Sequence, residues 1–236
     1  MPADREGLTR RRVLAHCSVL VAAALGPRSV RAADAGRASQ RILVVGDSLS
    51  AEYGLARGTG WVALLEQRLA REHVDATVVN ASISGDTTSG GRARLPALLT
   101  QHRPTLVVIE LGANDALRGL PLEETRANLV AMAEAAKSAG ARVVIVGMQI
   151  PPNYGRRYAE QFAAVFAEVA RAAGTALVPF MLHGVADAPD ADRLFQPDRI
   201  HPLASAHPTI LANIWPVLAP MLATRAARPR ADAMTR

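Results

Sequence analysis

The chain of 236 residues is poor in cysteine and in aromatic side chains. Its single cysteine, Cys17, lies near the N-terminus, so the rest of the chain has no thiol for a disulfide or a thiolate nucleophile. Aromatic residues make up only 4% of the chain while 50% of it is hydrophobic, so the core must consist of Ala, Val, Leu and Ile. No cluster of His, Asp and Glu has metal-ligand spacing, and no glycine-rich phosphate loop follows the first apolar run. We therefore expect no metal and no cofactor.

The chain also lacks a basic face, although its formal net charge is +6. Residues 1–32 carry a charge of +4 and residues 224–236 a charge of +3, which leaves −1 on the stretch between them. The positive charge therefore belongs to the two ends and does not indicate nucleic-acid binding. We expect no nucleic-acid partner, and we interpret residues 224–236 as an Arg-rich flexible tail.

The N-terminal segment has the three parts of a secretory signal. A basic group, Arg10 to Arg12, precedes a mostly apolar run over residues 13–25, and small residues lead up to Ala32. The basic group resembles a twin-arginine export signal. The apolar run is too short to span a bilayer core of roughly 30 Å. We expect cleavage after Ala32 and a periplasmic or secreted mature protein without a stable membrane anchor; an uncleaved N-terminal anchor is the alternative.

From residue 41 onward, short apolar runs alternate with amphipathic stretches. The apolar runs predict strands at about 42–45, 76–79, 105–111, 142–148 and 176–179. The amphipathic stretches predict helices at about 60–72, 92–101, 123–138, 157–173 and 205–223. Strand and helix alternating at this spacing favour right-handed crossovers and a parallel sheet. We predict an α/β fold in which residues 33–223 form one three-layer α/β/α sandwich around a doubly wound, flavodoxin-like parallel sheet of five strands.

Chemically useful residues follow several of these strands. Ser48 follows the first strand, Gly85 the second and Asn114 the third, while Asp198 and His201 lie in an irregular segment after the fifth. In a doubly wound sheet these loops share one edge, so residues far apart in sequence can meet there.

The residue types suit nucleophilic catalysis. Ser48 needs a base, and histidine accepts and returns a proton near neutral pH. Asp198 lies three residues before His201 and can hold its tautomer. The backbone N–H groups of Ser48 and Gly85 and the amide of Asn114 can stabilise an oxyanion. From the residues alone, a helix cap at Ser48, plain turn residues and a solvated loop pair remain open alternatives.

Other polar residues are expected to be structural. We expect Asp47 and Asp115 to tie the loops together through hydrogen bonds to backbone N–H groups. The remaining candidates for a catalytic histidine have no partner at useful spacing and are interpreted as surface or helix-end residues: His73, His102, His183 and His207.

Four ordered blocks of sequence resemble those of the SGNH/GDSL hydrolases. They are Gly-Asp-Ser-Leu-Ser at 46–50, Asn-Ala-Ser-Ile-Ser-Gly-Asp-Thr at 80–87, Gly-Ala-Asn-Asp at 112–115 and Asp-Arg-Ile-His-Pro at 198–202. Residues 94–99 and 153–158 add a likeness to the periplasmic thioesterase, lysophospholipase and arylesterase group of that superfamily. The resemblance implies that Ser48 is the nucleophile, His201 the base and Asp198 its orienting partner. It also implies an oxyanion hole made by Ser48, Gly85 and Asn114.

The resemblance further implies an exported, monomeric serine esterase for small-molecule or lipid esters. Aryl esters and short- to medium-chain acyl esters are the expected substrates, and thioesters and lysophospholipids stay open. Relatives in the thioesterase group have a longer Arg-Leu-Pro insertion where this chain has a short loop at 149–154, which favours the shorter chains. The residues expected to line the substrate site are Leu117, Leu120, Ile150, Pro151 and Tyr154.

Two positions depart from the family pattern, with Ala113 and Glu52 standing where many relatives have glycine. Two other functions also remain open. One is a carbohydrate or cell-wall O-acetylesterase with the same catalytic residues. The other is a non-enzymatic, flavodoxin-like binding module.

Overall fold

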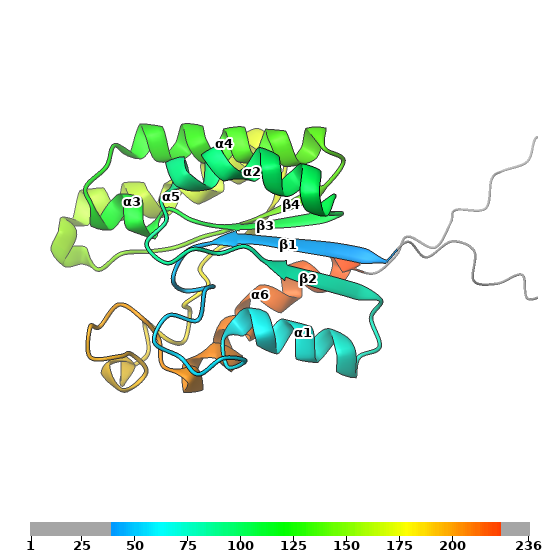
Figure 1. Ribbon diagram of the computed structural model, residues 1–236. Helices are drawn as coiled ribbons and strands as arrows, with labels where there is room; N and C mark the ends of the chain where they lie inside the picture. The colour runs from blue at the N-terminus through cyan, green and yellow to red at the C-terminus, as the bar shows by residue number, and fades with distance from the viewer. Residues whose placement is uncertain (1–38, 223–236) are drawn as a thin grey trace, which may run out of the picture. The chain divides into compact units, whose positions relative to one another are not determined.

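The computed structural model describes residues 39–222. The predicted signal peptide at 1–32 and the tail at 224–236 lie outside these residues. Five parallel strands form one sheet in the order β2-β1-β3-β4-β5 (Figure 1). The strands are β1 (Gln40–Gly46), β2 (Ala76–Asn80), β3 (Leu106–Glu110), β4 (Arg142–Val146) and β5 (Ala176–Val178). The prediction of a five-stranded parallel sheet of flavodoxin-like order is confirmed.

Helices cover both faces of this sheet (Figure 1). One face carries α2 (Thr88–His102), α4 (Leu122–Ser138) and α5 (Arg156–Ala173). The other face carries α1 (Trp61–Arg71) and α6 (His207–Leu222). A short helix, α3 (Ala113–Leu117), follows β3. The three-layer sandwich is therefore confirmed, and none of the helices between residues 39 and 222 is long and apolar enough to cross a membrane.

The central strands are continuous apolar runs because helices bury both of their faces. All residues of β3 are buried, and Ile42 to Val45 of β1 are at most 1% exposed. The edge strand β2 is only half-buried. Among the few aromatic side chains, Phe162 and Phe166 pack edge to face in α5, with their ring centroids 5.2 Å apart. Trp61 is the third fully buried aromatic side chain, and most of the remaining core is aliphatic, as the composition predicts.

Helix boundaries differ from the sequence prediction at two places. The second helix begins at Thr88 and not near residue 92, since Thr87 caps it by accepting a hydrogen bond from the Gly90 N–H. Two glycines in its first turn lower the helix propensity, which hides the start. A Cβ at Gly91 would lie 2.2 Å from Leu111 Cδ1, so a larger residue there requires the buried Leu111 side chain to move. The five-residue helix α3 is too short to produce a periodic signal.

Gly147 provides a test of close packing at the end of β4. A Cβ at this position would lie 2.2 Å from the Pro179 carbonyl oxygen and 2.8 Å from that of Val178. A methyl group must therefore push two backbone segments apart. We expect Gly147→Ala to lower the free energy of unfolding by about 1–3 kcal/mol, measured by urea denaturation. The control Gln101→Ala, on the exposed surface of α2, is expected to stay within about 0.5 kcal/mol of the parent, and equal losses would contradict the packing argument.

Candidate active site

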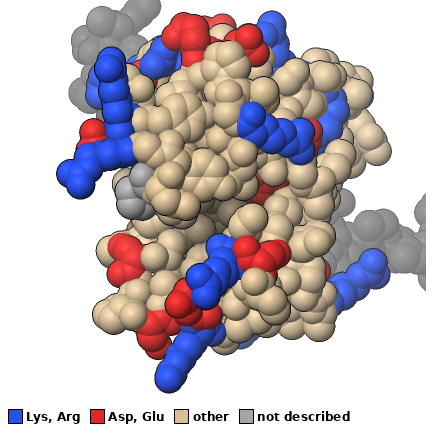
Figure 2. Space-filling view, turned by 90° about the vertical axis from the view of Figure 1, so that its left-hand side faces the viewer, with Lys and Arg blue, Asp and Glu red and all other residues tan. Residues whose placement is uncertain are grey.

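The residues predicted for the site lie at the carboxyl edge of the sheet. Figure 2 looks onto this edge, where a hollow lies in a surface made largely of uncharged residues. Ser48 lies in the turn after β1, Gly85 in the loop after β2 and Asn114 in α3 after β3. Asp198 and His201 lie in the long segment between β5 and α6. The parallel topology thus brings four separate loops to one place.

Ser48, His201 and Asp198 form a continuous hydrogen-bonded chain. His201 Nε2 lies 2.8 Å from Ser48 Oγ, and His201 Nδ1 lies 2.6 Å from Asp198 Oδ2. The second oxygen of Asp198 accepts hydrogen bonds from the backbone N–H groups of Ile200 and His201, both at 3.0 Å. Each imidazole nitrogen therefore has one partner, which is the arrangement of a serine nucleophile, its base and an orienting carboxylate.

The electrostatics of Asp198 suit this arrangement. Partial burial alone would raise its pKa, but the N–H groups of His201 and Ile200 and the imidazole outweigh that effect and lower the pKa to about 2. The tight turn that makes these contacts possible places Arg199 in the left-handed region, with a φ of 58°. Asp198 is therefore a carboxylate at neutral pH and can stabilise a protonated His201.

Two backbone N–H groups are free to bind an oxyanion. Those of Ser48 and Gly85 have no acceptor among residues 39–222, and Gly85 has a φ of 78°, a conformation that favours glycine. The third predicted donor is already engaged. Asn114 Nδ2 donates to Asp47 Oδ2 at 3.0 Å and to the Asp86 carbonyl oxygen at 2.9 Å. An oxyanion must therefore share one of these two amide hydrogens.

Arg94, on α2, holds the ends of the loops together. Its Nε donates to Asp86 Oδ2 at 2.8 Å, and its Nη2 donates to the Gly46 carbonyl oxygen at 3.3 Å. A further hydrogen bond joins its Nη1 to the Ala81 carbonyl oxygen. One guanidinium group thus links the end of β1 to the loop that carries Gly85. In the sequence, Arg94 stands out only as part of a family block, and no local pattern indicates this role.

The structural roles expected for Asp47 and Asp115 are confirmed. Asp47 Oδ1 accepts a hydrogen bond from the Leu49 N–H at 3.0 Å, which closes the turn around Ser48. Asp115 Oδ2 accepts one from the Thr88 N–H at 2.9 Å, which joins α3 to the start of α2. Both carboxyl groups are buried.

Gln196 joins the serine loop to the histidine loop. Its side-chain Nε2 donates to the Tyr53 carbonyl oxygen at 2.9 Å and to that of Pro202 at 3.3 Å. Its backbone N–H donates to the His201 carbonyl oxygen at 2.7 Å. The Tyr53 ring packs against the His201 ring, with centroids 4.4 Å apart. No motif in the sequence marks Gln196, so its bridging role emerges only from the fold.

The residues expected to line the substrate site divide into two groups. Tyr154 is 45% exposed, Pro151 is exposed, and Leu117 and Leu120 are half-buried. Ile150 is 8% exposed and packs within the hydrophobic core. Of the five residues predicted to line the substrate site, all except Ile150 are therefore at least partly exposed.

His183 and His207 have hydrogen-bond partners, so the prediction that they lack one is wrong. His207 begins α6 as a helix-end residue, but it is 1% exposed and its Nδ1 accepts a hydrogen bond from the Trp61 N–H at 2.9 Å. Burial lowers the pKa of His207. His183 Nδ1 lies 2.8 Å from Asp187 Oδ2. A backbone partner 146 residues away leaves no trace in local spacing.

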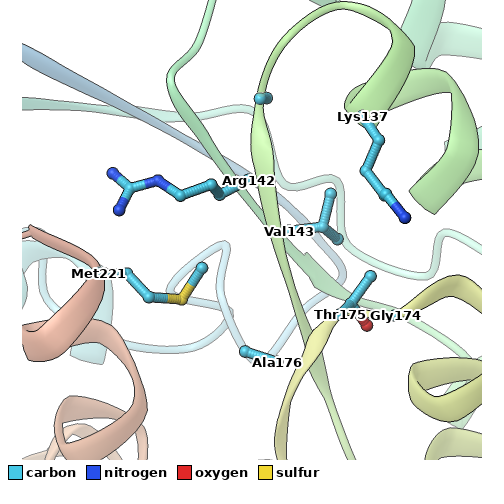
Figure 3. Close-up of a pocket in the computed structure, with 8 residues that line it drawn as sticks. Lys137, Arg142, Val143, Gly174, Thr175, Ala176 and Met221 are labelled. Atoms are coloured by element: carbon cyan, nitrogen blue, oxygen red, sulfur yellow. The ribbon is translucent and has the colours of Figure 1, made fainter. Parts of the chain in front are cut away.

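A second depression lies at the opposite edge of the sheet, at the amino ends of β4 and β5 (Figure 3). It encloses about 200 Å³ and is lined by Lys137, Arg142, Thr175 and Met221 among others. Lys137 and Arg142 point to different sides in Figure 3, so they do not converge on one ligand. Within residues 39–222 there is also no group of three or more metal-binding side chains.

A Ser–His–Asp chain beside free N–H groups, at the carboxyl edge of a parallel sheet, is the site of a serine hydrolase. Residues 44–208 match the model of the GDSL-like Lipase/Acylhydrolase family, and the chain belongs to that family.

Individual relatives agree with this assignment. Esterase TesA of Pseudomonas aeruginosa is 54% identical over 78% of this chain and 90% of its own length. Thioesterase 1/protease 1/lysophospholipase L1 of Escherichia coli is 42% identical over 73% of this chain and 80% of its own. The crystal structure of the psychrotrophic esterase EstA from Pseudoalteromonas, inhibited by monoethylphosphonate, has a TM-score of 0.73 and 39% identity. It covers 78% of this chain and all of that one.

Glu52 offers a test of how the serine loop is held. It has a φ of 58°, and its Oε1 accepts hydrogen bonds from the N–H groups of Gly60 at 2.7 Å and Gly58 at 3.0 Å. These charge-assisted bonds offset the cost of a left-handed residue. We expect Glu52→Ala to lower the free energy of unfolding by about 2–3 kcal/mol, because it loses the acceptor and keeps the strain.

The variant Glu52→Gly is the matched control. It loses the same acceptor but relieves the backbone strain, so its loss is expected to be about 1 kcal/mol smaller. Urea denaturation of both variants measures the difference. An alanine variant as stable as the glycine variant would contradict the account.

Proposed function

We propose that this protein hydrolyses carboxylic esters through an acyl-serine intermediate. The observation that carries the proposal is the chain from Ser48 through His201 to Asp198, with contacts of 2.8 and 2.6 Å. The nucleophile, its base and the orienting carboxylate stand within hydrogen-bond distance before substrate binds. His201 is thus placed to take the Ser48 proton as attack begins.

In the first half of the reaction, Ser48 Oγ attacks the ester carbonyl carbon and its proton passes to His201 Nε2. The carbonyl oxygen becomes an oxyanion that accepts hydrogen bonds from the N–H groups of Ser48 and Gly85 and from Asn114. The bond to the leaving-group oxygen then breaks. His201 gives its proton to that oxygen, the alcohol leaves, and the acyl group stays on Ser48.

In the second half, water replaces the alcohol. His201 takes a proton from the water as its oxygen attacks the acyl carbon, and the same donors hold the second oxyanion. The bond to Ser48 Oγ breaks, His201 returns the proton to the serine, and the carboxylic acid leaves. Asp198 stays charged throughout and stabilises the imidazolium that forms in each half.

We propose aryl esters and short- to medium-chain acyl esters as substrates, with thioesters and lysophospholipids as further candidates. The names of the relatives support this range, since they include an esterase and a thioesterase/lysophospholipase. The exposed apolar side chains of Pro151 and Tyr154 support an apolar acyl group. We further propose export, on the evidence of the N-terminal sequence, and a monomeric mature protein. N-terminal sequencing of the exported protein tests cleavage after Ala32.

Replacement of the nucleophile tests the mechanism. We expect Ser48→Ala to reduce kcat for p-nitrophenyl acetate by more than about 1000-fold, because no covalent intermediate can form. The melting temperature should stay within a few degrees, since the change removes only one half-buried hydroxyl and its hydrogen bond to His201. A fluorophosphonate probe should label the parent protein and not the variant. Hydrolysis by Ser48→Ala at the parental rate would refute the acyl-serine mechanism.

The acyl-chain preference tests the role of the short loop at 149–154. We expect kcat/KM on a series of p-nitrophenyl esters to peak below C12, because a short loop gives a long chain less wall to bury against. A maximum at C12 or longer would contradict this expectation and leave the catalytic mechanism intact. All esters are compared on the parent protein at equal concentrations, below the concentration at which the longer esters form micelles.

A further inference from the structure

A carboxyl group that the mechanism does not use lies directly beneath the serine turn. Glu110 is the last residue of β3 and is 2% exposed. Its Oε2 accepts hydrogen bonds from Ser50 Oγ at 2.6 Å and from the Asp47 N–H at 3.3 Å. No Lys, Arg or His of residues 39–222 forms an ion pair with it. A fully buried carboxyl group without a cation requires an explanation.

The backbone is built to bring Glu110 close to the turn. Strand register pairs Glu110 with Gly46, the residue before Asp47. A Cβ at Gly46 would lie 2.8 Å from Glu110 Oε2, so only glycine allows this approach. On the far side, Trp61 Nε1 donates to Ser50 Oγ at 3.1 Å and holds that hydroxyl toward Glu110.

Asp47 is the second buried carboxyl group, and its hydrogen bonds are those of an anion. It accepts the Leu49 N–H through Oδ1 and the Asn114 amide through Oδ2, both at 3.0 Å. Two adjacent buried carboxyl groups cannot both be ionised at low cost. Both oxygens of Asp47 accept hydrogen bonds, whereas both donors to Glu110 reach its Oε2 and leave Oε1 for a proton. The proton of the pair therefore belongs on Glu110.

The surrounding charges agree with this assignment. Burial, followed by repulsion from Asp47, raises the pKa of Glu110 well above its usual range. Burial also raises the pKa of Asp47 to about 7, opposed by the Leu49 N–H, while Asp86 and Asp115 add repulsion. The nearby cation, Arg94, is paired with Asp86. The pair titrates as a unit, and at neutral pH Glu110 is the member that keeps its proton.

We propose that Glu110 is a positioning residue, a protonated carboxyl group that holds Asp47 and, through Asp47, the oxyanion donor Asn114. This inference rests on the proposed function, because it assigns Asn114 a contact with the oxyanion. A residue that acts only in this way lowers kcat when it is lost and leaves KM nearly unchanged, since the oxyanion exists only in the transition state.

Two substitutions separate positioning from plain packing. Glu110→Leu keeps the volume and removes every hydrogen bond, and we expect kcat to fall about 10- to 100-fold with KM within about threefold. Glu110→Gln is a neutral match for a protonated carboxyl group, because its carbonyl oxygen can accept from Ser50 and from the Asp47 N–H while its NH2 replaces the carboxyl O–H. We expect it to restore kcat to within about threefold of the parent. Ile109→Val, a buried apolar change one residue away, is the control and should leave kcat unchanged.

A double-mutant cycle tests the route through Asn114. If Glu110 acts through that amide, Glu110→Leu combined with Asn114→Ala should lose no more kcat than Asn114→Ala alone. Additive losses would overturn the inference, and so would a Glu110→Gln variant as impaired as Glu110→Leu. If Glu110→Leu does not fold, the kcat of Glu110→Gln is the deciding measurement. A kcat within about threefold of the parent supports the inference, and a larger loss overturns it.

The proton itself is tested through stability. A raised pKa in the folded state means that stability is complete below the ordinary carboxyl pKa and is lost as the pH rises. We therefore expect the parent to lose unfolding free energy relative to Glu110→Gln between pH 5 and pH 8. A constant difference would overturn the inference. None of these outcomes bears on Ser48→Ala, whose full activity would instead refute the proposed function.

Discussion

The hydrogen bond between His201 Nε2 and Ser48 Oγ is the contact on which the site depends. It joins residues 153 positions apart, at 2.8 Å, across two loops that are distant along the chain. Gln196 links the two loops through its hydrogen bond to the Tyr53 carbonyl oxygen, and two further bonds fix it within the histidine loop. The turn at Asp198 holds the imidazole through Nδ1. Without this contact, Ser48 is an ordinary turn hydroxyl with no base.

Negative charge near the oxyanion is the second constraint. Acidic side chains gather under the site, and an uncompensated carboxylate there would oppose the charge that forms during the reaction. Each is compensated differently. Arg94 pairs with Asp86, the Thr88 N–H and hydroxyl satisfy Asp115, and the amide of Asn114 meets Asp47. In our proposal, Glu110 carries a proton and therefore adds no negative charge.

The loop that carries Tyr53 shows how this chain departs from the pattern of its family. At the position where the family resemblance leads one to expect glycine, Glu52 adopts a left-handed conformation and its carboxylate accepts hydrogen bonds from two N–H groups of the loop. These hydrogen bonds hold the residue just before Tyr53, whose ring packs against His201. The strained backbone of Glu52 is thus accompanied by hydrogen bonds that fix the loop beside the catalytic base.

By itself the sequence determined the strands, the parallel topology and the candidate residues Ser48, Gly85, Asn114, Asp198 and His201. Apolar runs and turn residues are local signals, and the ordered blocks carry the chemistry. Only the tertiary structure decided that Ile150 belongs to the core and that His207 is buried against α1. It also decided the contacts that Gln196, Arg94 and Glu110 make with the loops of the site. Their partners come from distant strands and loops, and contacts of that kind exist only once the sheet has brought its carboxyl ends together.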